Sequence, residues 1–268
     1  MTFQFDTGNA PFAAKVTAHP ANGFAKHGID HLSASSVNLW VNAPDMWVAK
    51  YLHGFKGRFG PAPVRGQCVE DGVVLALQGK SVADATAAAF ARFDKTFTKP
   101  DDDTAKERDL LAPMIEAALG ELRDFGEPEF QDGQQEKISI NADFGDWSIP
   151  VIGFLDLVYP SLGLVIDLKT TTRIPSQMSP EHQMQRAIYA KAKGNCAVKF
   201  LYVSAKKTAL LEDGDVAQTL ASLKAHIARL ARFLAHCDRD TALQVVPHNP
   251  GSFFWRGDES ARFQLFGT

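Results

Sequence analysis

The sequence predicts an α/β fold, a single domain over residues 1–268 with a mixed central β-sheet flanked by helices and a helical N-terminal part. Two observations carry this prediction. Apolar residues recur with a helical period before about residue 125, whereas from about residue 127 the period changes to two, as in strands. A helix, a strand and a long helix then follow, an order that favours one mixed sheet with a functional site at its edge.

The first part of the chain is expected to be an irregular arm at residues 1–32 and then a helical part at 33–125. Ser35 or Ser36 is a candidate N-cap for the first helix, and Pro44 complicates the middle of that helix. We interpret the acidic run at 101–103 as a helix cap rather than a metal site, because carboxylates stabilise the N-terminal end of a helix. The expected helices cover about 35–52, 66–77, 82–97 and 101–125.

The catalytic sheet is expected in residues 126–205, together with one helix. Ser179 suits the N-cap of that helix, Pro180 its first turn and Gly194 its end. A C-terminal helix and a loop-like, aromatic tail are expected in residues 206–268. The expected strands cover about 134–142, 147–159, 163–169 and 196–204, and the expected helices about 180–193 and 214–236.

Two apolar runs in this region each contain one aspartate, Asp156 in the first and Asp167 in the second. The runs are joined by residues 160–163, Pro-Ser-Leu-Gly, which have turn chemistry. If Tyr159 pairs with Leu164 across this turn, Asp156 lies directly opposite Asp167. Directly opposed side chains are separated by roughly 5 Å, so the hairpin is expected to bring the two carboxylates together.

Two carboxylates at that separation among apolar residues repel each other and lose hydration, so positive charge must offset them. Lys169 supplies one charge, because residues two apart in a strand point to the same face. A divalent cation, Mg²⁺ or Mn²⁺, is the natural second, and the backbone carbonyl of Leu168 is a candidate auxiliary ligand. Two carboxylates and a lysine suit metal-assisted attack of water on a phosphodiester, although Lys169 also suits a simple ion pair.

Composition restricts the other classes of protein to which the chain can belong. The net charge of −3 gives no global basic surface, so contact with nucleic acid must depend on local patches. The three cysteines form no CxxC pair, which argues against zinc, an iron–sulfur cluster and a disulfide framework, and favours free thiols in a reducing cytoplasm. No apolar run approaches ~18–20 residues, so no membrane partner is expected.

Three segments in combination resemble one known family. They are Gly153–Asp156, Asp167–Thr170 and Gln185–Tyr189, the last similar to a QxxxY motif. Together they resemble the PD-(D/E)xK nuclease superfamily, in particular its RecB-like and phage-exonuclease branch. The resemblance spans roughly residues 33–205 and includes Ser33–Trp40, similar to the first helix of such nucleases. No proline precedes Asp156, where the superfamily's name places one.

This resemblance implies a restriction-endonuclease-like domain and a Mg²⁺-dependent deoxyribonuclease whose products carry a 5′-phosphate and a 3′-hydroxyl. It favours an exonuclease for recombination, repair or phage DNA processing, in the cytoplasm of a bacterium or a phage-infected host. DNA is the expected partner, and a homo-oligomer or a single-strand-binding or annealing protein stays open. The alternatives are an inactive DNA-binding or scaffold protein, an endonuclease, and an RNA-directed nuclease of the same fold.

The expected site residues fall into three groups. Gln185 and Tyr189, four apart on one helix face, are expected to hold DNA phosphate or the lysine, against the alternative of an ordinary helix with a buried tyrosine. His182 could share that face. Glu70 is expected as a further ligand, against an exposed helix residue. The catalytic group is Asp156, Asp167, Lys169, Gln185 and Tyr189; the metal group is Glu70, Asp156, Asp167 and Leu168; the nucleic-acid group is Lys56, Arg58, Thr170, Thr171 and Arg173.

Two aromatic segments complete the expectations. Phe55 and Phe59 alternate with Lys56 and Arg58 in a glycine-rich loop, which suits phosphate contact and base stacking, against ordinary loop packing. The aromatic run at 253–255 is expected to dock on the core rather than stack on nucleic acid.

Overall fold

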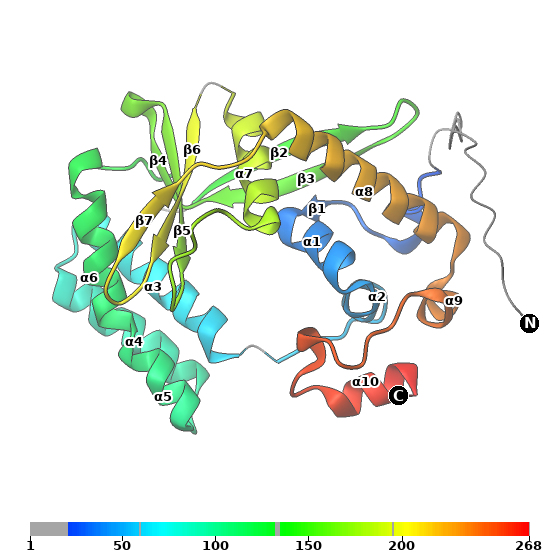
Figure 1. The fold of residues 1–268 in the computed structure, drawn as a ribbon, viewed down its shortest axis with the longest axis horizontal. Helices are drawn as coiled ribbons and strands as arrows, with labels where there is room; N and C mark the ends of the chain where they lie inside the picture. The colour runs from blue at the N-terminus through cyan, green and yellow to red at the C-terminus, as the bar shows by residue number, and fades with distance from the viewer. Residues whose placement is uncertain (1–20, 59, 132–134, 195, 268) are drawn as a thin grey trace, which may run out of the picture.

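The computed structural model describes residues 21–58, 60–131, 135–194 and 196–267. Within these ranges the protein is a mixed α/β fold with two β-sheets and helices packed around them (Figure 1). Most of the predicted N-terminal arm, residues 1–20, lies outside the described residues, as does Phe59.

The strands form two mixed sheets rather than the single sheet that we expected. In the first, with the order β1-β3-β2, β3 pairs parallel with β1 and antiparallel with β2. In the second, with the order β4-β5-β6-β7, β5 pairs antiparallel with β4 and parallel with β6. The strands are β1 (Leu32–Ser33), β2 (Glu136–Asp143), β3 (Ser148–Leu155), β4 (Leu157–Tyr159), β5 (Leu164–Thr170), β6 (Ala197–Val203) and β7 (Thr208–Leu211).

The division into two sheets occurs at Asp156. The prediction of one strand over 147–159 was wrong there, because β3 ends at Leu155 and β4 begins at Leu157. The turn that follows is as expected: Tyr159 pairs with Leu164, a short 3-10 helix follows, and Gly163 is left-handed with φ 55°. Asp156 is therefore one step beyond the β4–β5 ladder, at the position that faces Asp167.

The helices agree with the predicted pattern except at two breaks and at one start, because the helix expected at 66–77 begins at Pro61. The N-cap of α1 is Ser33 rather than Ser35 or Ser36, and it forms a capping box with Ser36. Pro44 begins a new helix, and the expected helix at 101–125 is divided at Leu110. Asp101 caps α5, as expected, by accepting the amide of Thr104 at 2.8 Å. The helices up to this region are α1 (Ala34–Asn42), α2 (Pro44–Leu52), α3 (Pro61–Leu77), α4 (Val82–Thr96), α5 (Asp102–Asp109) and α6 (Leu111–Leu122).

The C-terminal part contains more structure than the expected helix and loop-like tail. Ser179 caps α7 through the amide of His182, as predicted. The prediction of a loop-like tail was wrong, because short helices follow α8 and Trp255 is 1% exposed in a small apolar cluster with Met46. Docking of this aromatic segment is confirmed for Trp255 and wrong for Phe253 and Phe254, which are exposed. The helices are α7 (Pro180–Lys193), α8 (Val216–His236), α9 (Arg239–Val245) and α10 (Glu259–Phe266).

Two apolar cores lie on opposite faces of the β5–β6 pair. Along β5 the side chains alternate, so that Val165 joins the core with α1, α7 and α8, whereas Ile166 and Leu168 join the core with α3, α4 and α6. Figure 1 shows these two groups of helices on either side of the second sheet. Asp167 shares the face of Val165, which directs its carboxylate toward α7 at the junction of the sheets.

Candidate active site

Asp156 is a buried carboxylate, 7% exposed, at the break between β3 and β4. Its Oδ2 accepts the backbone N–H of Leu168 at 2.8 Å, so this side chain connects the interruption between β3 and β4 to β5. Its Oδ1 accepts the side-chain amide of Gln135 at 2.7 Å. These two bonds fix both oxygens of Asp156 beside the strand that contains Asp167.

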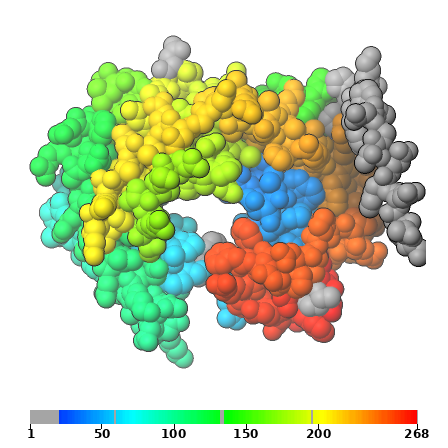
Figure 2. Space-filling model, in the orientation of Figure 1, coloured from blue at the N-terminus to red at the C-terminus, as the bar shows by residue number. Residues whose placement is uncertain are grey.

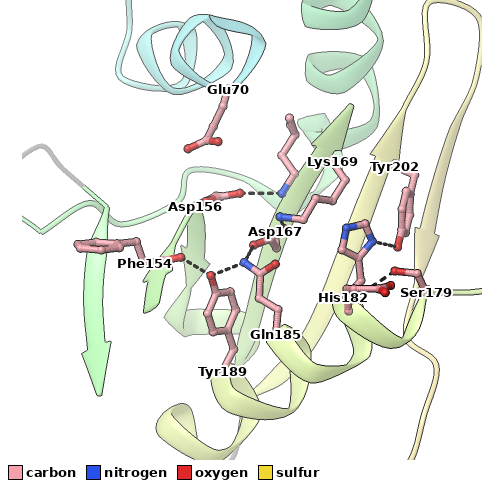
Figure 3. Close-up of polar contacts among 12 residues, drawn as sticks. Glu70, Phe154, Asp156, Asp167, Lys169, Ser179, His182, Gln185, Tyr189 and Tyr202 are labelled. Atoms are coloured by element: carbon pink, nitrogen blue, oxygen red, sulfur yellow. Dashed lines mark hydrogen bonds and ion pairs between the residues drawn. The ribbon is translucent and has the colours of Figure 1, made fainter. Parts of the chain in front are cut away.

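Glu70 approaches the same place from α3. Gly66, one turn earlier, lies close to β5: a Cβ there would be 3.1 Å from Thr170 Oγ1. Arg65 donates to the same hydroxyl at 3.2 Å and forms a partly buried ion pair with Glu107. This close contact of α3 with the end of β5 directs Glu70 toward the aspartates (Figure 3). The amide of Gln135 that binds Asp156 also donates to Glu70 Oε1, so one nitrogen lies between two carboxylates.

Asp167 is 1% exposed and forms an ion pair through Oδ2 with the Lys169 ammonium. This pair confirms that the two side chains point to the same face of β5, while Leu168 between them lies in the opposite core. The Lys169 nitrogen also lies 5.2 Å from the centre of the Phe200 ring. Oδ2 of Asp167 is buried and has no hydrogen-bond partner among the described residues apart from this ion pair.

Gln185 and Tyr189 of α7 hold Asp167 in place. Gln185 Nε2 donates to Asp167 Oδ1 at 3.0 Å and to the Tyr189 hydroxyl at 2.6 Å, and that hydroxyl donates to the Phe154 carbonyl at 2.6 Å. Gly153 makes this chain of contacts possible, because a Cβ there would be 2.6 Å from the Tyr189 ring. The QxxxY pair therefore contacts the aspartate, whereas we expected it to hold the lysine or a phosphate.

Burial and mutual repulsion shift the protonation of all three acids. Desolvation raises the pKa of Asp156 well above its ordinary value, and the nearby Asp167 and Glu70 raise it further. Desolvation and Asp167 raise the pKa of Glu70 to about 7. Desolvation also raises the pKa of Asp167, although Lys169 opposes the shift. For Lys169, burial lowers the pKa, but the attraction of Asp167 and Asp156 outweighs it and the net shift is upward. The single positive charge of Lys169 therefore does not fully offset the negative charge of the three carboxylates.

The donor set fits a hard divalent cation. Carboxylate oxygens from Glu70, Asp156 and Asp167 are the ligands that Mg²⁺ and Mn²⁺ prefer. Asp167 Oδ2 is buried, and its contact among the described residues is the ion pair with Lys169. Among the described residues, however, no three His, Cys, Asp or Glu side chains lie close enough together to coordinate a metal ion as they stand. The Gln135 amide and the Lys169 ammonium lie against the acids instead. Assignment of the Leu168 carbonyl as a ligand stays a prediction.

The residues expected to contact nucleic acid divide into two sets. Thr170, Thr171 and Arg173 line a pocket of about 410 Å³ beside Lys169. Lys56 and Arg58 lie elsewhere, in the exposed loop between α2 and α3, where Arg58 contacts Asp258 through its backbone N–H at 3.1 Å. Phe55 in that loop packs against Trp255 with ring centres 5.6 Å apart, which is ordinary loop packing.

Two parts of the site were not foreseen. Gln135 lies in a polar stretch before β2 that has no motif, and only the fold places it between Glu70 and Asp156. His182 shares a hydrogen bond of 2.6 Å with the Tyr202 hydroxyl, on the far side of Lys169 from the acids (Figure 3). The spacing of His182 and Gln185 suggested a shared face, but nothing in the sequence indicated Tyr202 as a partner.

Comparisons with known proteins assign neither a family nor an activity. The sequence matches no family model and no curated protein. A solved structure described as the crystal structure of SSO0001 is similar over 64% of this chain and 85% of its own, with a TM-score of 0.34 and 14% sequence identity. A likeness of that size carries no argument about activity. None of the helices in the described ranges is long and apolar enough to cross a membrane, and Cys68, Cys196 and Cys237 are free thiols.

Proposed function

We propose that this protein is a metal-dependent deoxyribonuclease of the PD-(D/E)xK type. One observation carries the proposal: Asp156 and Asp167, both buried, meet beside Lys169 at the junction of two sheets, with Glu70 directed at them from α3. Buried like charges are costly unless a cation compensates them, so such a cluster favours an ion as its natural ligand. A carboxylate cluster with a lysine is the donor set that metal-assisted phosphodiester hydrolysis requires.

Each side chain has a distinct part in this proposal. Asp156, Asp167 and Glu70 would hold Mg²⁺ or Mn²⁺, which when bound polarises a phosphoryl oxygen and lowers the pKa of water. Lys169 would orient the attacking water and stabilise the negative charge that develops on the phosphate. Gln185 and Tyr189 would act through Asp167, by fixing the orientation of its carboxylate.

The preference for DNA and for exonuclease action is supported by the sequence resemblance. In the hydrolysis, the water oxygen bonds to phosphorus and the bond from phosphorus to the 3′ oxygen breaks, leaving a 5′-phosphate and a 3′-hydroxyl. Arg173, which forms no ion pair with any described residue, lines the pocket beside Lys169 together with Thr170 and Thr171, where phosphates next to the reacting one would pass.

The experiment is to incubate linear and closed circular DNA with the protein in Mg²⁺, in EDTA, and with the Asp167→Ala variant. Asp109→Ala, which removes an exposed carboxylate on α5, is the matched control. We expect degradation in Mg²⁺ that EDTA and Asp167→Ala abolish and Asp109→Ala retains. Degradation of linear but not closed circular DNA would support an exonuclease, and single-stranded RNA in parallel tests the nucleic-acid class. Absence of Mg²⁺-dependent degradation with every substrate would overturn the proposal.

A further inference from the structure

A pocket of about 410 Å³ lies on the opposite side of Lys169 from the three acids. Its wall begins at the end of β5, continues along the loop from Thr171 to Met178, and is completed by the first turn of α7 and by Tyr202 of β6. Its lining includes Lys169, Arg173, Pro175, Pro180, His182 and Tyr202. The loop after β5 borders the opening that Figure 2 shows between α7, α3, α1 and the C-terminal segment, so the pocket can be reached from outside.

The charge of this pocket is opposite to that of the acid cluster. None of its lining residues is acidic, and two are cations, Lys169 and Arg173. Lys169 is paired with Asp167, so Arg173 carries the uncompensated charge. The Arg173 guanidinium is exposed and forms no ion pair within the described ranges. An arginine of this kind suits a phosphate, because an ionised acceptor strengthens each hydrogen bond that the guanidinium donates.

The rest of the wall suits a nucleoside rather than a second phosphate. Pro175 and Pro180 contribute apolar surface, against which a base can pack. Met178, which is 1% exposed, lies beneath this surface in the core. Burial, together with the charge of Lys169, lowers the pKa of His182 to about 4, so its imidazole is neutral at neutral pH. The bond between His182 and Tyr202 fixes both rings, which gives the pocket rigid, uncharged polar groups at the edge of this apolar surface. A volume of about 410 Å³ lies in the range of small-molecule pockets.

We infer that this pocket binds one nucleotide unit of the substrate strand, a nucleoside monophosphate next to the reacting phosphodiester. The inference rests on the proposed function only for the position of the reacting phosphate beside Lys169. The phosphate of the bound unit contacts the Arg173 guanidinium, and its base lies against the surface of Pro175 and Pro180.

The test uses calorimetry in EDTA, so that no cleavage is required. Deoxyadenosine 5′-monophosphate, inorganic phosphate and deoxyadenosine are titrated into the full chain. We expect the nucleotide to bind more tightly than either fragment. Arg173→Gln should weaken nucleotide binding about tenfold or more, as for loss of a charged hydrogen bond, while deoxyadenosine binding stays unchanged. Lys95→Gln, an exposed charge loss on α4, is the matched control and should leave all three affinities unchanged.

Tyr202→Phe provides a second variant, since it retains the ring and removes only the hydroxyl that holds His182. It should weaken the nucleotide and deoxyadenosine and leave inorganic phosphate unaffected. Equal affinities for nucleotide and phosphate, or no nucleotide binding in the unmodified protein, would overturn the inference. Nucleotide binding without DNA cleavage would support the pocket as a nucleotide site and reject the proposed nuclease activity. DNA cleavage without nucleotide binding would support the nuclease activity and reject the nucleotide site.

Discussion

Gln135 contacts two of the three acids that are expected to bind the metal. Its side-chain nitrogen donates to both Glu70 Oε1 and Asp156 Oδ1, so it lies between two carboxylates that are expected to bind a cation. An amide nitrogen carries only a partial positive charge, and it must leave this position before the two oxygens can share an ion. Gln135 is therefore expected to compete with the metal, and Gln135→Ala should tighten metal binding.

The size of the effect follows from the bonds that the metal must displace. A hydrogen bond to a charged group contributes about 1.5–3 kcal/mol. Removing a competitor of that strength should strengthen binding by roughly 10- to 100-fold, at about 1.4 kcal/mol for each factor of ten. The same substitution leaves the two carboxylates without their shared donor, so the metal-free variant should unfold at a lower temperature than the unmodified protein.

The assay is calorimetric titration with Mn²⁺, combined with thermal unfolding in EDTA. Gln218→Ala, at an exposed position on α8, is the matched control and should change neither result. Weaker Mn²⁺ binding by Gln135→Ala would show that the amide oxygen is a ligand instead, and would refute the competition. Unchanged binding together with unchanged stability would show that the contact between Gln135 and the two acids does not form in solution.

Four further predictions concern the same centre. Lys169→Met should retain Mn²⁺ affinity within a few-fold, since it removes no oxygen ligand, but should abolish DNA cleavage; loss of both would mean that Lys169 holds the acids together. Asp156→Asn should remove most Mn²⁺ affinity by calorimetry, and equal affinity would refute its role as a ligand. Tyr189→Phe should lower cleavage about tenfold or more, because Gln185 loses its partner and Asp167 its fixed direction; an unchanged rate would make the pair structural only. The raised pKa of Glu70 gives the folded, metal-free protein protons that the unfolded chain has lost, so its stability should fall as pH rises from 4.5 to about 7, and Mg²⁺ should restore it; rising stability in EDTA over that window would contradict the shift.

Local chemistry explains what could be predicted from the sequence. The turn at 160–163 joins two strands into a hairpin. The residues that flank this turn therefore predict the register in which Tyr159 pairs with Leu164. Likewise Ser179 before Pro180 predicts the start of α7, and the spacing of Asp167 and Lys169 predicts their shared face. Each of these depends on contacts between neighbours in the chain.

The missed features depend on contacts between distant parts of the chain. The strand break at Asp156 requires its side chain to accept the amide of Leu168, which no pattern within 147–159 reveals. Similarly, the tail at 248–266 is ordered because Asp45, buried in α2, accepts the Trp255 indole N–H at 2.9 Å. Gln135 acquires its position only when α3 and β3 meet, so sequence patterns alone could not place it.

The central claim is that Glu70, Asp156 and Asp167 bind one divalent ion beside Lys169. Anomalous diffraction from crystals soaked in Mn²⁺ tests it most directly, because the peak locates the ion without reference to activity. We predict a peak within bonding distance of oxygens from both aspartates, with the Gln135 amide moved away from Asp156. Absence of a peak at this place in a crystal that binds Mn²⁺ elsewhere, with Gln135 still between the acids, would contradict the claim.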